Sequence, residues 1–215
     1  MTFSSCLFNR SEGLVLDSSV IINLLATGSP GAILKSLAIP LWVTEQVISE
    51  ISQGLTNGRQ GSGSLEKLVN DGVLNVAVPS SSSLKIFFAM VAGQTANSLG
   101  DGEAATIAHS ISNGLLAAID EKKATRIANE RFNSLQLVTT VDILACELVL
   151  KTIGKELLSK AVCQALQVAR MQVREHQFDW VLQLIGKEEA ERCSCLKRHI
   201  KRRPPVLPYN RDEAI

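Results

Sequence analysis

Four acidic residues stand where apolar runs end or where helical segments begin: Asp17 after Leu14–Leu16, Glu50 within Val47–Ile51, Glu103 after Gly100–Gly102, and Asp120 after Leu115–Ile119. Carboxylates at strand ends can converge, because ligand sites of parallel α/β sheets lie outside the carboxyl ends of the strands. Several carboxylates cannot stay ionised close together without a compensating cation. Their hard oxygen ligands suit Mg²⁺ or Mn²⁺. The pattern therefore indicates metal-assisted cleavage of a phosphodiester.

Other chemistries have weaker support in the sequence. Cys193, Cys195 and His199 are ligand types that zinc accepts, but their spacing matches no finger or ribbon and no fourth ligand is near. His109 falls within the helical segment after Glu103, where a structural role is favoured over general-base catalysis. No nucleophile–His–Asp arrangement and no phosphate-cradling glycine loop stands out.

Composition sets the class of protein. With 46% hydrophobic and 20% charged residues among 215, the chain is predicted to be a soluble globular protein with room for one α/β domain and a short extension. The net charge of +1 gives no strong overall field, so any attraction to phosphate must be local. An odd number of cysteines, five, without framework spacing fits a reducing compartment. We predict a cytoplasmic protein without membrane segments, since no signal peptide and no apolar run of about 18–20 residues is found.

Short apolar runs alternate with helical segments, which predicts a parallel sheet covered by helices on both faces. The strands are expected at residues 14–17, 40–43, 73–78, 115–120 and 135–139. Ser18 and Ser19 are expected to cap the first helix, and Thr44 the helix that carries Glu50. We predict a nuclease-like domain over residues 13–150, a helical extension over 151–192, with amphipathic helices at 161–174 and 177–185, and a basic, proline-bearing tail over 193–215.

The acidic segments resemble, in the same order, the motifs of PIN-domain nucleases, the family that includes VapC-type toxins. The first is Leu14-Val15-Leu16-Asp17-Ser18-Ser19, the second Val47-Ile48-Ser49-Glu50-Ile51, the third Gly100-Asp101-Gly102-Glu103-Ala104-Ala105, and the fourth Ala118-Ile119-Asp120-Glu121-Lys122-Lys123. Each motif alone is common, whereas four in series, each with an acid, form a specific signal. The resemblance covers residues 13–150 and implies a three-layer α/β/α fold around a parallel sheet of about five strands.

The resemblance also implies roles for single residues. Asp17, Glu50, Glu103 and Asp120 would form the catalytic site. Asp17, Glu103 and Asp120 would hold Mg²⁺ or Mn²⁺, and Glu50 would act through a water molecule. Ser18 would hydrogen-bond a carboxylate or a phosphate oxygen. The implied activity is that of an endoribonuclease, as the toxin of a toxin–antitoxin pair with RNA as substrate and a small antitoxin protein as partner.

Each acid has a structural alternative. Any of them alone could be a turn, capping or solvated residue, although this is a weak account of all four together. Capping is the favoured role for Asp142, and Asp101 and Glu121 are weaker site candidates than their neighbours. An alternative function is a non-catalytic PIN-like module that binds nucleic acid or protein. The sequence leaves the oligomeric state open, including a homodimer.

The C-terminal segment is strongly basic. Lys197, Arg198, Lys201, Arg202 and Arg203 lie in a stretch without acids, which can neutralise RNA phosphates. The alternative is a solvated tail, which the following prolines favour. The charge pattern alone does not decide between the two.

Overall fold

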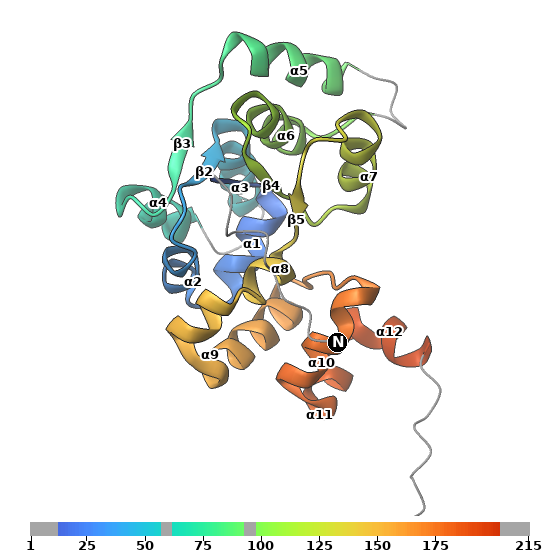
Figure 1. Ribbon diagram of the computed structural model, residues 1–215. Coiled ribbons are helices and arrows are strands. Elements are labelled where there is room, and N and C mark those ends of the chain that lie inside the picture. Colours follow the sequence, from blue (N-terminus) through green and yellow to red (C-terminus); the bar gives the residue numbers. More distant parts are fainter. Residues whose placement is uncertain (1–12, 57–61, 93–97, 203–215) are drawn as a thin grey trace, which may run out of the picture.

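The computed structural model describes residues 13–56, 62–92 and 98–202 and centres on a parallel sheet (Figure 1). Its five strands lie in the order β3-β2-β1-β4-β5. They are β1 (Leu14–Leu16), β2 (Leu41–Thr44), β3 (Asn75–Ala77), β4 (Leu116–Ala118) and β5 (Leu137–Val138). All four neighbouring pairs are parallel, which confirms the predicted sheet. The chain moves outward from β1 to β3 and then returns to β4 on the other side of β1, so the topological switch point lies between β1 and β4.

The central strands are short and apolar because both faces of the sheet are covered. Along β4 and just beyond it, alternate side chains enter two separate cores. Leu116 and Ala118 belong to the larger core, whereas Ala117 and Ile119 belong to the smaller one. This two-residue alternation directs the next side chain, Asp120, to the face of the larger core.

Helices form the outer layers on the two faces. The larger core joins the sheet to α1 (Ser18–Ala26), α2 (Pro30–Ser36), α3 (Glu45–Thr56), α4 (Ser62–Asn70), α8 (Thr140–Leu144) and α9 (Glu147–Val168). The smaller core lies under α5 (Ser81–Val91), α6 (Asp101–Asn113) and α7 (Lys122–Arg131) (Figure 1). The arrangement is the predicted three-layer α/β/α fold.

The predicted helical extension is present and continues the larger core. Gly154, with φ 78°, divides α9 into two helical stretches. Next come the 3₁₀ turn η2 (Glu175–Gln177), α10 (Phe178–Ile185) and α11 (Lys187–Arg192). The helix predicted over residues 161–174 was wrong at its end, because α9 stops at Val168 and Arg170 adopts a left-handed φ of 55°. The proposed division at residue 150 stays a prediction.

Part of the basic segment is folded. A 3₁₀ turn, η3 (Ser194–Leu196), leads into α12 (Lys197–Arg202), while Arg203 and the prolines lie outside the described residues. Cys193 and Leu196 are fully buried in the larger core. His199 stacks on Phe178 with ring centroids 5.2 Å apart. This packing favours an ordered segment over a solvated one as far as Arg202.

None of the helices in the described ranges combines the length and the apolar character needed to cross a bilayer.

Candidate functional site

Asp17 directly follows β1 and is the N-cap of α1, a role that the sequence suggested for Ser18 and Ser19. Its Oδ2 accepts hydrogen bonds from the Ser19 amide at 3.2 Å and the Ser19 hydroxyl at 2.7 Å. The side chain is almost completely buried. Burial raises the pKa of Asp17, the Ser19 and Ser18 donors partly offset this, and the charge of Glu50 adds to it. The carboxylate is therefore fixed in position, and among the described residues no cation is found to offset its charge.

Glu50 reaches the same end of the sheet from α3. The Ser18 hydroxyl donates to Glu50 Oε2 at 2.7 Å, and the Gly102 amide donates to Oε1 at 2.8 Å. Gly102 leaves the space for this contact: a Cβ there would lie 2.8 Å from Glu50 Cδ and 2.9 Å from Oε1. The expected role of Ser18 as a carboxylate donor is thus present, and Glu50 links the N-termini of α1 and α6.

Glu103 lies in the first turn of α6, where the Gly100 amide donates to its Oε2 at 3.2 Å. Burial, together with the nearby charges of Asp17, Glu121 and Glu50, raises the pKa of Glu103 to about 7, and the Gly100 amide partly offsets the shift. Negative charge is therefore concentrated between α1, α3 and α6.

Asp120 has a different environment. Its Oδ1 accepts from the Thr140 amide at 2.9 Å, and its Oδ2 accepts from the Thr140 hydroxyl at 2.5 Å and from Asn23 Nδ2 at 2.7 Å. Burial raises the pKa of Asp120, while Thr140, Asn23 and the charge of Arg174 lower it. The donors come from α1 and α8, which cover the larger-core face of the sheet. This is the face to which the alternation along β4 directs Asp120.

The predicted acids differ in which charges act on them. Asp17, Glu50 and Glu103 influence one another electrostatically. Asp120 lies at the end of the neighbouring strand: the Asp17 amide donates to the Ala118 carbonyl at 3.1 Å, two residues before Asp120. In the described part of the chain, no group of three or more His, Cys, Asp or Glu side chains is close enough together to hold a metal ion.

These residues nevertheless suit a hard divalent cation. Mg²⁺ is usually held by only one or two carboxylates, with waters and substrate phosphates completing its coordination. Asp17 supplies a buried carboxylate and Glu103 a half-buried one, and burial followed by the charges of nearby acids raises the pKa of both. Asp120 keeps one acceptor position free, since a carboxylate has about four lone-pair sites and three donors use it.

The weaker candidates have structural roles in their observed contacts. Glu121 caps α7 by accepting from the Lys123 amide at 3.3 Å, and Asp142 forms a capping box with Thr139 at the start of α8. Asp101 is exposed in the first turn of α6. Burial lowers the pKa of His109, whose ring packs against Trp42 with centroids 5.9 Å apart.

The cysteines considered as zinc ligands have contacts typical of packing. Burial and the neighbouring Cys193 raise the pKa of the Cys195 thiol to about 11, and its sulfur donates to the Leu166 carbonyl at 3.5 Å. The His199 ring nitrogens lie 2.9 Å from the Val173 carbonyl and 3.2 Å from Glu175 Oε2. Within the described ranges these side chains belong to no group of three or more that could hold a metal ion, which does not support the zinc alternative.

Several residues around the acids had no role in the sequence-based prediction: Asn23, Gly102, Thr140 and Arg174. Gly102 had a signal, since a glycine one residue before a motif acid indicates close approach of another group. No local sequence signal marked Asn23, Thr140 or Arg174. Their contacts with Asp120, or with α7 just after it, join residues far apart in the sequence.

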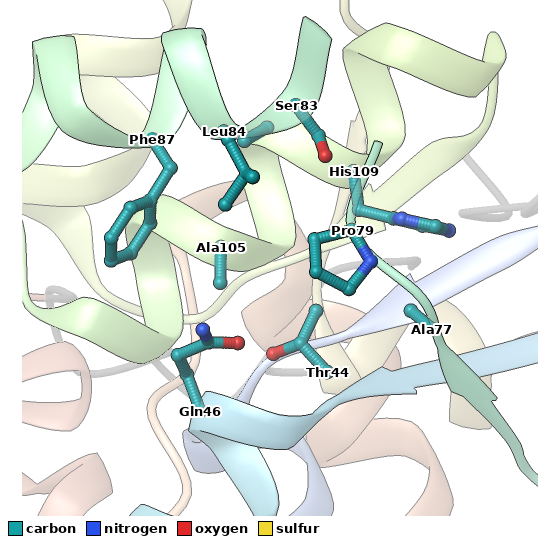
Figure 2. Close-up of a pocket in the computed structure, with 10 residues that line it drawn as sticks. Thr44, Gln46, Ala77, Pro79, Ser83, Leu84, Phe87, Ala105 and His109 are labelled. Carbon is teal, nitrogen blue, oxygen red and sulfur yellow. The ribbon is translucent and has the colours of Figure 1, made fainter. Parts of the chain in front are cut away.

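A small pocket lies beside the acids but does not contain them. Figure 2 shows it between the start of α3, the segment after β3, and the helices α5 and α6. Gln46 lies one helical turn before Glu50, and Ala105 lies two residues after Glu103. None of the predicted acids lines the pocket. It is formed by Thr44, Gln46, Ala77, Pro79, Ser83, Leu84, Phe87, Ala105, Ala108 and His109.

Comparison with known families agrees with the fold. Neither the curated proteins nor the solved structures include a match to this chain. A family model described as a PIN domain matches residues 13–187, most of the chain and well beyond the motif region. The protein therefore belongs to the PIN-domain family, whose members are generally nucleases.

Proposed function

We propose that this PIN domain is an endoribonuclease dependent on Mg²⁺ or Mn²⁺. The observation that supports this most is the concentration of Asp17, Glu50 and Glu103 at the carboxyl end of the sheet, where the pKa of Glu103 rises to about 7. Like charges held together at a partly buried site, with a strongly raised pKa, mark a candidate functional site. The hydroxyl of Ser18 and the amide of Gly102 hold Glu50 toward this cluster.

Each acid has a part in the proposed reaction. Asp17 and Glu103 would hold the ion directly, and Asp120 would contribute through its remaining lone pair. The ion, when bound, lowers the pKa of water and polarises a phosphoryl oxygen. Glu50, fixed by two hydrogen bonds, would orient the attacking water and accept its proton. Ser18 would keep the Glu50 carboxylate aligned.

A cleavage assay tests the activity. Purified protein is incubated with labelled single-stranded RNA, and separately with DNA of the same sequence, with Mg²⁺, Mn²⁺ or chelator. We expect metal-dependent cleavage of RNA that is lost with chelator and with Asp17→Asn. Cleavage of DNA alone would contradict the RNA specificity, and cleavage in chelator would contradict the metal dependence.

The proposed biological role is that of a cytoplasmic toxin that a small antitoxin neutralises. The order of the acidic motifs supports it through the resemblance to VapC-type toxins. Expression of the wild-type protein should arrest bacterial growth, and expression of Asp17→Asn should not. Equal growth with both proteins would contradict the toxin role while leaving the nuclease activity to the cleavage assay.

One observation favours the alternative, a module that binds RNA or protein without cleaving. Asp120 already accepts three hydrogen bonds from Asn23 and Thr140, so most of its acceptor positions are filled without an ion. Binding of RNA with no cleavage in either metal would favour this function over the enzyme.

A further inference from the structure

The C-terminal extension brings an arginine to the Asp120 side of the candidate site. After α9 ends, residues 169–174 run without helical structure to η2. There Gln177 is completely buried, and its Nε2 donates to Thr139 Oγ1 at 2.7 Å and to Asp142 Oδ1 at 3.1 Å. Its Oε1 accepts from the Arg174 amide at 3.0 Å. Arg174 is thereby fixed relative to the start of α8, where Thr140 binds Asp120.

The side chain of Arg174 points back across the start of α7. Its Nη2 donates to Thr125 Oγ1 at 2.9 Å. The Thr125 hydroxyl hydrogen is directed to the Glu121 carbonyl at 2.9 Å, so its oxygen is free to accept from the guanidinium. Glu121 directly follows Asp120, and the positive charge of Arg174 is close enough to act on the Asp120 carboxylate.

This guanidinium has little of its binding capacity in use. The ion pairs found in the described ranges join other basic residues to acids, and none within 4.0 Å involves Arg174. Within the described ranges its side chain makes one hydrogen bond, to Thr125, although a guanidinium has five N–H donors in a planar fork. The side chain is partly buried, so it is held in place but remains accessible. Such a group is suited to bind an anion in addition to its interaction with Asp120. Two N–H groups of a guanidinium can donate to the same phosphate in a bidentate manner.

The basic segment continues from this point. The residues on both sides of Arg174 contact α12, since the His199 ring nitrogens approach the Val173 carbonyl and the Glu175 carboxylate. The cations of α12, including Lys197 and Lys201, are therefore carried by a helix attached next to Arg174. Arg202 pairs with Glu175 at 3.8 Å, whereas Lys197 and Lys201 are exposed and form no ion pair within 4.0 Å in the described ranges.

We propose that Arg174 binds a backbone phosphate of the nucleic acid and so positions the strand at the carboxylates. The proposal rests on the proposed function, since it names a substrate contact for the same site. It also gives the extension a role in substrate binding. Gln177 and Thr125 fix the position of Arg174 by hydrogen bonds, and Arg174 would bind the substrate. Arg174 is a substrate-binding residue here, so its loss should act on binding before chemistry.

Binding without turnover tests this directly. Affinity for a fluorescent single-stranded RNA is measured in chelator by anisotropy over a range of salt concentrations, with the melting temperature of each protein recorded. Arg174→Gln should weaken binding about 10-fold and reduce the slope of log affinity against log salt by about 0.7, the value for one phosphate contact on a single strand. Arg174→Lys should keep the slope but lose part of the affinity, because lysine is a point charge without the fork.

A matched control removes a positive charge elsewhere. Lys160 is exposed on α9 and paired with Glu156 at 2.8 Å, so Lys160→Gln should change neither affinity nor slope. A folded Arg174→Gln protein with wild-type affinity and slope would overturn the proposal and show that Arg174 only fastens the extension. In that case metal-dependent cleavage abolished by Asp17→Asn would leave the proposed function intact. If the wild-type protein neither binds nor cleaves RNA, both proposals fail.

Discussion

The carboxylates in the two halves of the candidate site have different neighbouring charges. On the side of α3 and α6, Asp17, Glu50 and Glu103 are held by hydroxyls and amides while their charges repel one another. On the side of α7 and α8, Asp120 accepts three hydrogen bonds and lies near a positive charge. Both halves are built at the carboxyl end of the same sheet.

The difference shows that acids from the same set of sequence motifs can contribute differently to the stability of the fold. Asp120 completes a buried hydrogen-bond network that joins α1 to α8, so the packing of these two helices depends on it. The cluster around Glu103 raises the energy of the metal-free protein, because burial and like charges disfavour ionisation. Burial raises the pKa of the acids in both halves; like charges add to this around Glu103, whereas the charge of Arg174 partly offsets it at Asp120.

The largest expected effect is on catalysis. Asp17→Asn keeps an oxygen to accept from Ser19 and cap α1, but it removes a charged ligand. Cleavage of RNA should fall at least about 100-fold, since even indirect partners of a metal site cost 10–100-fold when lost. The matched control is Asp101→Asn, which removes an exposed carboxylate from the first turn of α6 and should keep near wild-type rates. Equal losses in both variants would contradict a specific role for Asp17.

The second effect is on stability and should separate the two halves. In Asp120→Asn an amide hydrogen must face donors from Asn23 or Thr140, which leaves buried donors without acceptors. The free energy of unfolding of the metal-free protein should fall by about 1–3 kcal/mol. Asp17→Asn should instead leave it unchanged or raise it, because a repelling charge is removed. Urea unfolding in chelator measures the free energy of unfolding of both variants. An Asp120→Asn protein more stable than the wild type would contradict the expected difference between the two halves.

The third effect concerns Gly102, which leaves space for the Glu50 carboxylate. Gly102→Ala places a Cβ against the Glu50 carboxylate, which is the far end of a flexible side chain and can turn away. Stability should therefore change little, while cleavage falls about 10-fold as Glu50 loses its alignment. In Gly100→Ala the nearest contact, Glu103 Oε2, is an ordinary 3.8 Å away, so cleavage should be retained. Similar rates for the two variants would argue against a role for the Glu50 position.

The sequence was sufficient for the sheet and for the acids that follow its strands. Apolar runs buried on both faces are readable as central strands, and strand ends are where parallel folds gather ligands. It was not sufficient for the partners of Asp120. Asn23, Thr140 and Arg174 are ordinary polar residues, and only the tertiary fold places them beside a carboxylate or its helix. The end of α9 was also missed, since nothing in the local pattern marks the left-handed turn at Arg170.

The smallest expected effect is a pH dependence that comes from the repelling half. The pKa of Glu103 is about 7 in the folded protein against an ordinary value of 4.5. Between these two values the folded protein holds a proton that the unfolded chain has released. The stability of the metal-free protein should therefore fall as pH rises through this window. Because Glu103 is partly exposed, solvent screening keeps the effect modest.

Thermal melts in chelator at pH 5 and pH 8 measure this effect. Glu103→Gln still accepts from the Gly100 amide through its side-chain oxygen, so it should match the wild type at pH 5 and melt higher at pH 8. Glu66→Gln, which changes an exposed glutamate on α4, should follow the wild-type curve at both values. Mg²⁺ should raise the wild-type melting temperature more at pH 8 than at pH 5, since a cation binds the ionised form. If Glu103→Gln shows the same fall as the wild type, the charges around Glu103 are already compensated in solution, and the contrast between the two halves is lost.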